Sequence, residues 1–158
     1  MSERLKKIGL CVCTSVLLVF GASPGSAELF SIEASIEAPL SFVYGTLPFL
    51  HKGQKICRFT LIYVDNRPNE ALVAELYSTD VVVAGTAFPE RATIARIETT
   101  GAKDVLRKKS TIAIASPTID TAQNFYSYAI FHIPNPEPTF DAYFMGHGIQ
   151  LDVRASCP

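Results

Sequence analysis

Short stretches in which apolar and polar residues alternate recur along the chain, and this period-two pattern constrains the fold more than any other feature. In the clearest run Phe30, Ile32 and Ala34 alternate with serine and glutamate. Successive side chains of a strand point to opposite faces, so such a run predicts a strand with one buried face. Further alternating, β-branched or aromatic runs predict strands at 40–44, 56–65, 81–84, 93–100, 111–115, 125–133 and 140–154.

Proline and glycine separate these runs at regular intervals, as at Pro39, Pro117 and the segment 134–138. The charged stretch 101–110 is expected to be a connection, and 70–77 is ambiguous because its helix-forming residues also alternate. At eight residues it is short for a helix, which favours a strand or a single helical turn. The pattern predicts an all-β protein, a small antiparallel β-sandwich or barrel of seven to nine strands with room for one short helix.

The first 27 residues have the layout of a secretory signal peptide. A basic start with Arg4, Lys6 and Lys7 precedes the apolar run 8–22, and small residues follow Pro24 up to Ala27. An uncleaved anchor is the alternative, but 15 apolar residues are short against the ~20 that span a bilayer. A lipoprotein is disfavoured because Cys11 and Cys13 lie inside the apolar run. We expect cleavage after Ala27 and a periplasmic or secreted product without stable membrane insertion.

Residues 28–158 then form one β-rich domain of 131 residues, a common size for a single core. Cleavage lowers Lys+Arg from 14 to 11 and Asp+Glu from 15 to 14, which leaves a net charge near −3. That balance argues against nucleic acid as a partner, because nucleic-acid-binding domains are normally basic.

Only two cysteines, Cys57 and Cys157, lie beyond the predicted signal peptide. An oxidising compartment would tend to join them, and the bridge would close a loop of about 100 residues. The alternatives are two free thiols or a chemical role, and the absence of a Cys-x-x-Cys spacing argues against the latter.

Histidine is the first residue type to consider for catalysis or metal binding, and the chain has three. Met145 and His147 share one face of a predicted strand and are weak candidates for a copper site, so no metal and no cofactor is expected. A hydrolase would need a base such as His132 or His147 beside Asp141 or Asp152. The sequence has neither a Gly-x-Ser-x-Gly nor a Ser-x-x-Lys motif.

Two sets of residues are weak candidates for a binding surface. The basic set is the most concentrated positive charge in the chain, and the aromatic set lies on predicted strands, where aromatic residues more often belong to the core. The basic set is Lys103, Arg107, Lys108 and Lys109, and the aromatic set is Tyr126, Tyr128 and Tyr143 with Phe144.

These features favour an exported binding or accessory module with a protein or cell-envelope partner, rather than an enzyme. A small secreted hydrolase with a histidine-centred site is the first alternative. The second is a structural subunit of a surface assembly that lends its strand 30–36 to a neighbour by β-augmentation. Neither the partner nor the oligomeric state is specified by the sequence.

Overall fold

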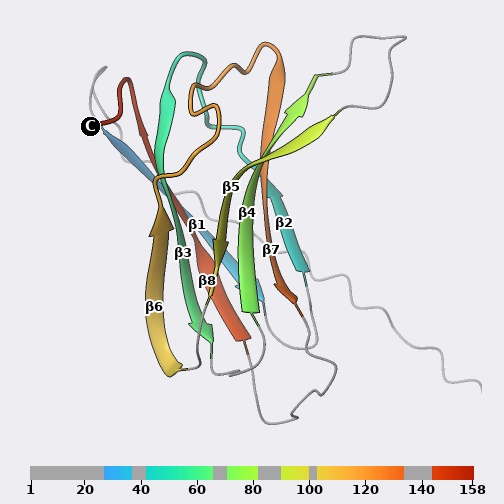
Figure 1. Cartoon of the computed structure of the whole chain (residues 1–158), viewed down its shortest axis with the longest axis vertical. Coiled ribbons are helices and arrows are strands. Elements are labelled where there is room, and N and C mark those ends of the chain that lie inside the picture. The colour runs from blue at the N-terminus through green and yellow to red at the C-terminus, as the bar shows by residue number, and fades with distance from the viewer. Residues whose placement is uncertain (1–26, 37–41, 66–70, 82–89, 100–102, 134–143) are drawn as a thin grey trace, which may run out of the picture.

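Eight antiparallel strands form two four-stranded sheets that pack face to face in a computed structural model of the chain (Figure 1). The structure describes residues 27–36, 42–65, 71–81, 90–99, 103–133 and 144–158. The strands are β1 (Glu28–Ile36), β2 (Phe42–Thr46), β3 (Lys55–Asp65), β4 (Ala71–Asp80), β5 (Arg91–Glu98), β6 (Lys103–Thr111), β7 (Asn124–Ile133) and β8 (Phe144–Arg154). Sheet A has the order β1-β8-β3-β6, and sheet B has the order β2-β7-β4-β5. The predicted β-sandwich is confirmed.

The core fills the space between the sheets with the alternate residues that the sequence pattern marks as apolar. Phe59 and Leu61 of β3 are fully buried in sheet A, opposite Leu72 and Leu76 of β4 in sheet B. Each such side chain contributes roughly 1.5–3 kcal/mol by leaving water. Because Leu72 and Leu76 reach the core with strand spacing, 70–77 contributes a strand to sheet B, and the described residues contain no helix.

The prediction for 101–115 is wrong in two places. The charged stretch expected to be a connection is strand β6. It is an edge strand, and charged side chains are common on the exposed side of such strands. The strand expected at 111–115 is absent from the described segment, because the chain leaves sheet A after Thr111. The Ala115 amide then donates to the Ile94 carbonyl in sheet B, at 2.7 Å. We call 112–115 the switching segment.

Strand β8 continues through Gly146-His147-Gly148, although its register with β3 and β1 shifts there. Gly146 and Gly148 face consecutive residues of β3, so His147 is the additional residue of a β-bulge. Gly148 has φ +140°, and a Cβ atom there would lie 2.0 Å from the carbonyl oxygen of Ile32. Glycine therefore lets β1 approach β8 closely.

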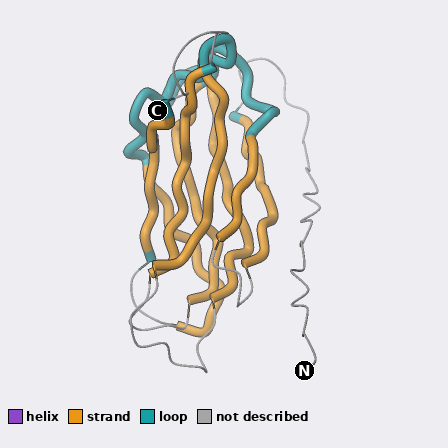
Figure 2. The backbone as a smooth tube through the Cα atoms, turned by 90° about the vertical axis from the view of Figure 1, so that its right-hand side faces the viewer, coloured by secondary structure: helices purple, strands orange, loops and turns teal. Residues whose placement is uncertain are grey.

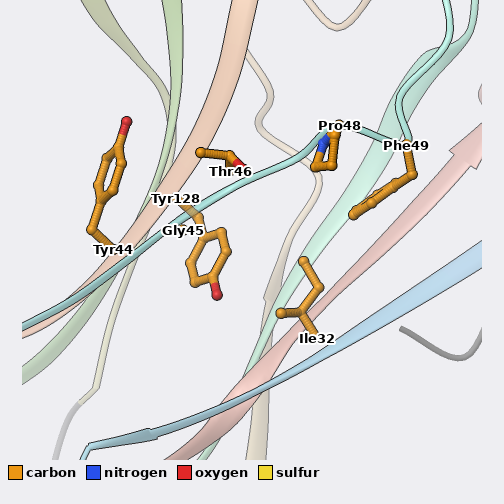
Figure 3. Close-up of a pocket in the computed structure, with 7 residues that line it drawn as sticks. All are labelled: Ile32, Tyr44, Gly45, Thr46, Pro48, Phe49 and Tyr128. Carbon is orange, nitrogen blue, oxygen red and sulfur yellow. The ribbon is translucent and has the colours of Figure 1, made fainter. Parts of the chain in front are cut away.

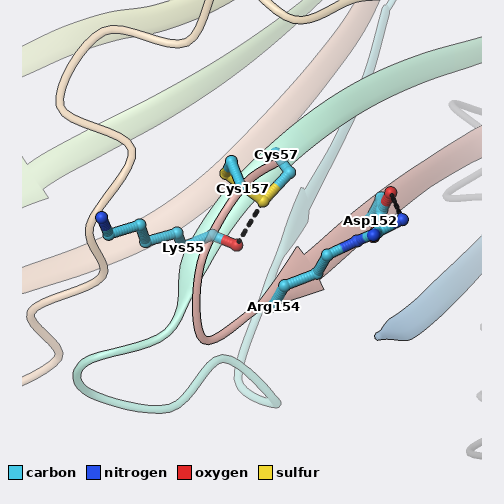
Figure 4. Close-up of a disulfide and its surroundings, with 5 residues drawn as sticks. All are labelled: Lys55, Cys57, Asp152, Arg154 and Cys157. Atoms are coloured by element: carbon cyan, nitrogen blue, oxygen red, sulfur yellow. Dashed lines mark hydrogen bonds and ion pairs between the residues drawn. A yellow bond between two sulfur atoms is a disulfide. The ribbon is translucent and has the colours of Figure 1, made fainter. Parts of the chain in front are cut away.

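A disulfide joins Cys57 to Cys157, with 5.2 Å between their Cα atoms (Figure 4). Cys57 is the additional residue of a second bulge, between Ile56 and Arg58. The bulge lets Ile56 join the core cluster, and Cys57 next to it is also buried. A cavity of about 310 Å³ lies beside the bond, lined by residues that include Ile112, Ile114 and Pro158.

The described loops 47–54 and 112–123 gather at one end of the sandwich, together with the C-terminal residues (Figure 2). Several predicted features lie outside the described residues: the segments 1–26, 66–69, 82–84, 134–138 and 140–143. In the part of the chain that the structure describes, no helix is long and apolar enough to cross a membrane.

Candidate functional site

A groove of about 460 Å³ opens between edge strands β1 and β2 (Figure 3). Its volume is in the range of small-ligand sites, which are concave and mostly apolar with a few polar groups. Its walls come from both sheets and from the loop after β2. The lining residues are Ile32, Tyr44, Gly45, Thr46, Pro48, Phe49 and Tyr128.

Gly45 makes the groove possible, because it leaves room for the ring of Tyr128. Gly45 pairs with Tyr128 across β2 and β7. A Cβ atom on Gly45 would lie 2.4 to 2.6 Å from three atoms of the phenol, much closer than real Cβ contacts. The Tyr128 ring therefore lies against the backbone of the edge strand at Gly45, where a side chain would displace it.

Aromatic packing forms the end of the groove near the loop. The rings of Phe30 and Phe49 are stacked, with 4.3 Å between their centroids. Tyr44 and Thr46 lie on the opposite side of β2 from Tyr128, and Tyr44 is 45% exposed. The hollow between Tyr128, Phe49 and Ile32 is therefore mainly apolar, and Tyr44 and Thr46 border it from the other side of β2.

The opposite side of the sandwich, where β5 and β6 are the edge strands, is closed by polar contacts. We call it the closed side, and we call the side with β1 and β2 the groove side. Asp65 is 0% exposed and accepts a 2.6 Å hydrogen bond from the Thr99 hydroxyl. The same hydroxyl accepts a bond from the Leu72 amide, so the end of β3 is tied to β4 and to the residue after β5. Buried polar groups of this kind are costly unless they are satisfied.

The basic set on β6 is divided between different surfaces. Arg107 lies 5.0 Å from the Tyr63 ring and donates to the Asp65 carbonyl, and Lys109 donates across the sheets to the Glu98 carbonyl. Lys108 instead contacts Gln150 on the outer face of sheet A. Lys103 lies opposite Asp65, with its side chain outside the described part. Two of the four cations, Arg107 and Lys109, therefore make contacts that hold the closed side together.

A network on the outer face of sheet B surrounds Tyr77. Its hydroxyl donates to Glu75, which also pairs with Arg96, and Arg91 stacks 4.2 Å above the ring. Burial and the hydrogen bond to Glu75 raise the pKa of Tyr77 to about 12. The raised pKa moves deprotonation of the phenol even further from neutral pH, which is typical of a structural group rather than an activated nucleophile.

The histidine candidates are in different sheets. The backbone of His132 lies in β7 of sheet B, opposite Leu72, and that of His147 lies in the β8 bulge of sheet A. Their side chains and that of Met145 are outside the description, as are Asp141 and Tyr143. Asp152 forms an ion pair with Arg154, whose guanidinium donates one hydrogen bond to each carboxylate oxygen. Within the described ranges no three His, Cys, Asp or Glu residues form a metal-binding group.

Of the aromatic candidates, Tyr128 lines the groove, and the buried Tyr126 accepts a hydrogen bond from the Asp120 amide. The sequence analysis missed the other groove residues. The predicted strand 40–44 stops before Gly45, whereas β2 includes it, and a glycine within a strand often marks a close approach of another group. Comparison with models of known protein families and with curated proteins finds no match for the chain.

Proposed function

We propose that this protein is an exported binding module that takes a small, mostly apolar ligand in the groove between β1 and β2. The observation that carries the proposal is the groove itself, about 460 Å³ with walls from both sheets. The rings of Tyr128 and Phe49 would cover the ligand's apolar part, together with Ile32.

The export part of the proposal rests on the signal-peptide pattern of residues 1–27. A disulfide between Cys57 and Cys157 is compatible with an oxidising compartment. Intact-mass analysis of the protein recovered from the periplasm or medium should give a chain that begins at Glu28. A product that retains residues 1–27 would contradict the export proposal and leave the groove proposal untouched.

The pairing of β1 inside its own sheet supports a binding module over a subunit that lends this strand to a neighbour. Six consecutive residues, Glu28 to Glu33, have partners in β8. Lending the strand would break this whole ladder and expose Phe30 and Ile32, which are buried in the core.

A fluorescent apolar probe, N-phenyl-1-naphthylamine, tests the groove directly. We expect saturable binding with one site per chain. Phe49→Ala should weaken the binding about tenfold, because it removes an aromatic wall that is worth roughly 1–2 kcal/mol of contact.

Phe125→Ala is the matched control. Phe125 is an exposed phenylalanine at the start of β7, outside the groove lining. Its replacement should leave the probe affinity unchanged. Equal losses in the two variants, or no saturable binding by the parent protein, would refute the groove as a ligand site.

A further inference from the structure

The two edge strands of sheet A carry opposite charge. In β1 the described side chains include Glu28 and Glu33 and no cation. The sequence of β6 contains four cations and one anion, in a chain whose net charge is −1. Edge strands present unpaired backbone groups that can pair with another chain, so the two edges are complementary in charge and in hydrogen bonding.

The strand directions allow the two edges to meet. Because β1, β8, β3 and β6 alternate in direction, β1 and β6 run antiparallel to each other across the sheet. A second copy in the same orientation, placed beside β6, would therefore present its β1 as an antiparallel neighbour. The alternation of sheet A would continue without interruption from one copy to the next.

The outer faces of these strands also match in register. Three residues on the outer face of β1, Leu29, Ser31 and Glu33, read apolar, polar and acidic. In the opposite chain direction, Ser110 and Lys108 of β6 are polar and basic, and the apolar Ile112 follows directly after the end of the strand. An antiparallel register that opposes Ser31 to Ser110 also opposes Glu33 to Lys108 and Leu29 to Ile112. The two apolar residues are 60% and 76% exposed in a single copy.

A row of polar residues already crosses sheet A between the two proposed contact points. Gln150 on β8 donates to Ser31 on β1, at 2.8 Å, and Thr60 on β3 is 2.8 Å from Ser110 on β6. Gln150 and Thr60 are direct partners in the β3–β8 ladder. In the proposed register this row would run on into the next copy.

We infer that sheet A continues between copies of this chain, with β1 of one copy paired to β6 of the next through Glu33–Lys108, Ser31–Ser110 and Leu29–Ile112. The contact joins two different surfaces, so it is heterologous and leaves a free edge at each end of an assembly. It involves the outer edge of β1, on the side of the sandwich where the groove lies.

Sedimentation velocity of the full chain over a concentration series tests the inference. Self-association should weaken with added salt, and Lys108→Glu or Glu33→Lys alone should raise the dissociation constant roughly tenfold, because each opposes like charges. A chain that carries both reversals restores the pair and should return to within about threefold of the parent value. Lys52→Glu, the same charge change in the exposed loop between β2 and β3, is the control and should have no effect.

A carbodiimide cross-linker, which joins carboxylates to amines in direct contact, gives a second readout on the unmodified protein. A mixture of isotopically light and heavy chains should yield the mixed-label peptide that links Glu33 to Lys108. A monomer at every concentration would overturn the inference. So would association that both single reversals leave unchanged, failure of the double reversal to restore it, or cross-links between other surfaces only.

Discussion

The two long sides of the sandwich, where the edge strands of the two sheets meet, are built in opposite ways. On the closed side, Lys109 reaches the Glu98 carbonyl of the other sheet, and the switching segment bonds to Ile94. On the groove side, Gly45 and the ring of Tyr128 leave an aromatic hollow between β1 and β2. Hydrogen bonds between the edge strands close one side, whereas the side without such bonds between its edge strands in the described residues holds a groove where a ligand can bind.

The largest effect is expected from the disulfide, which holds the C-terminal residues near the switching segment. Cys157→Ala should lower the free energy of unfolding by about 4 kcal/mol, because a loop of 100 residues is no longer constrained in the unfolded chain. Urea denaturation measures the loss, and reduction of the parent protein should reproduce it. A loss below about 1 kcal/mol would show that the closed side does not depend on the bond.

Asp65→Ala should cause the next largest loss in the free energy of unfolding, since it removes the buried acceptor that ties β3 to the residue after β5. The Thr99 hydroxyl would lose its acceptor in a dry site, at a cost of about 3 kcal/mol. Asp80→Ala, at the exposed end of β4, is the control and should change the free energy of unfolding by less than about 0.5 kcal/mol. Similar losses in both variants would contradict the role given to the closed side.

On the groove side, Gly45→Ala should force the Tyr128 ring out of its place across β2. We expect a loss of about 2 kcal/mol in the free energy of unfolding, typical of overpacking, together with weaker binding of the naphthylamine probe. Ala92→Val adds bulk to an exposed position of β5, the other edge of sheet B, and should leave both quantities close to the parent values. Unchanged probe binding in Gly45→Ala would contradict the role that we assign to Gly45 in shaping the groove.

The smallest effect is expected at alkaline pH from Tyr77, beside β5. The unfolded phenol releases its proton near pH 10, whereas the folded protein retains it up to about pH 12. The contribution is therefore complete below pH 10 and is lost as the pH rises towards 12, so the free energy of unfolding should fall more steeply there than in Tyr77→Phe. Identical pH profiles of the two proteins, measured by urea denaturation, would contradict this account.

Much of the fold could be predicted from the sequence, because strand periodicity is a local property. The runs predicted as strands at 56–65 and 125–133 appear as β3 and β7. The charged stretch 101–110 was misassigned, since Arg107 and Lys109 look solvated in sequence. In the structure Arg107 donates to the Asp65 carbonyl of its own sheet, and Lys109 donates to the Glu98 carbonyl of the other sheet.

The groove could not be predicted in the same way, because it depends on which strands become neighbours. Tyr128 appeared in the sequence as one of several strand aromatics, and Gly45 as the start of a loop. Their functional meaning arises only when β2 pairs with β7 in the register that sets one against the other. Phe49 and Ile32 join the groove through contacts between the two sheets, which strand periodicity does not encode.

The pairing of β1 with β8 has a consequence for biosynthesis. In this ladder Glu28 lies beside Val153, more than a hundred residues later in the chain. Since β1 has no other neighbour in its sheet, sheet A cannot close until the ribosome has made β8. Contacts of such long range also slow folding. During translation the nascent chain therefore lacks its complete native structure, a state suited to a translocation channel that accepts only unfolded polypeptide.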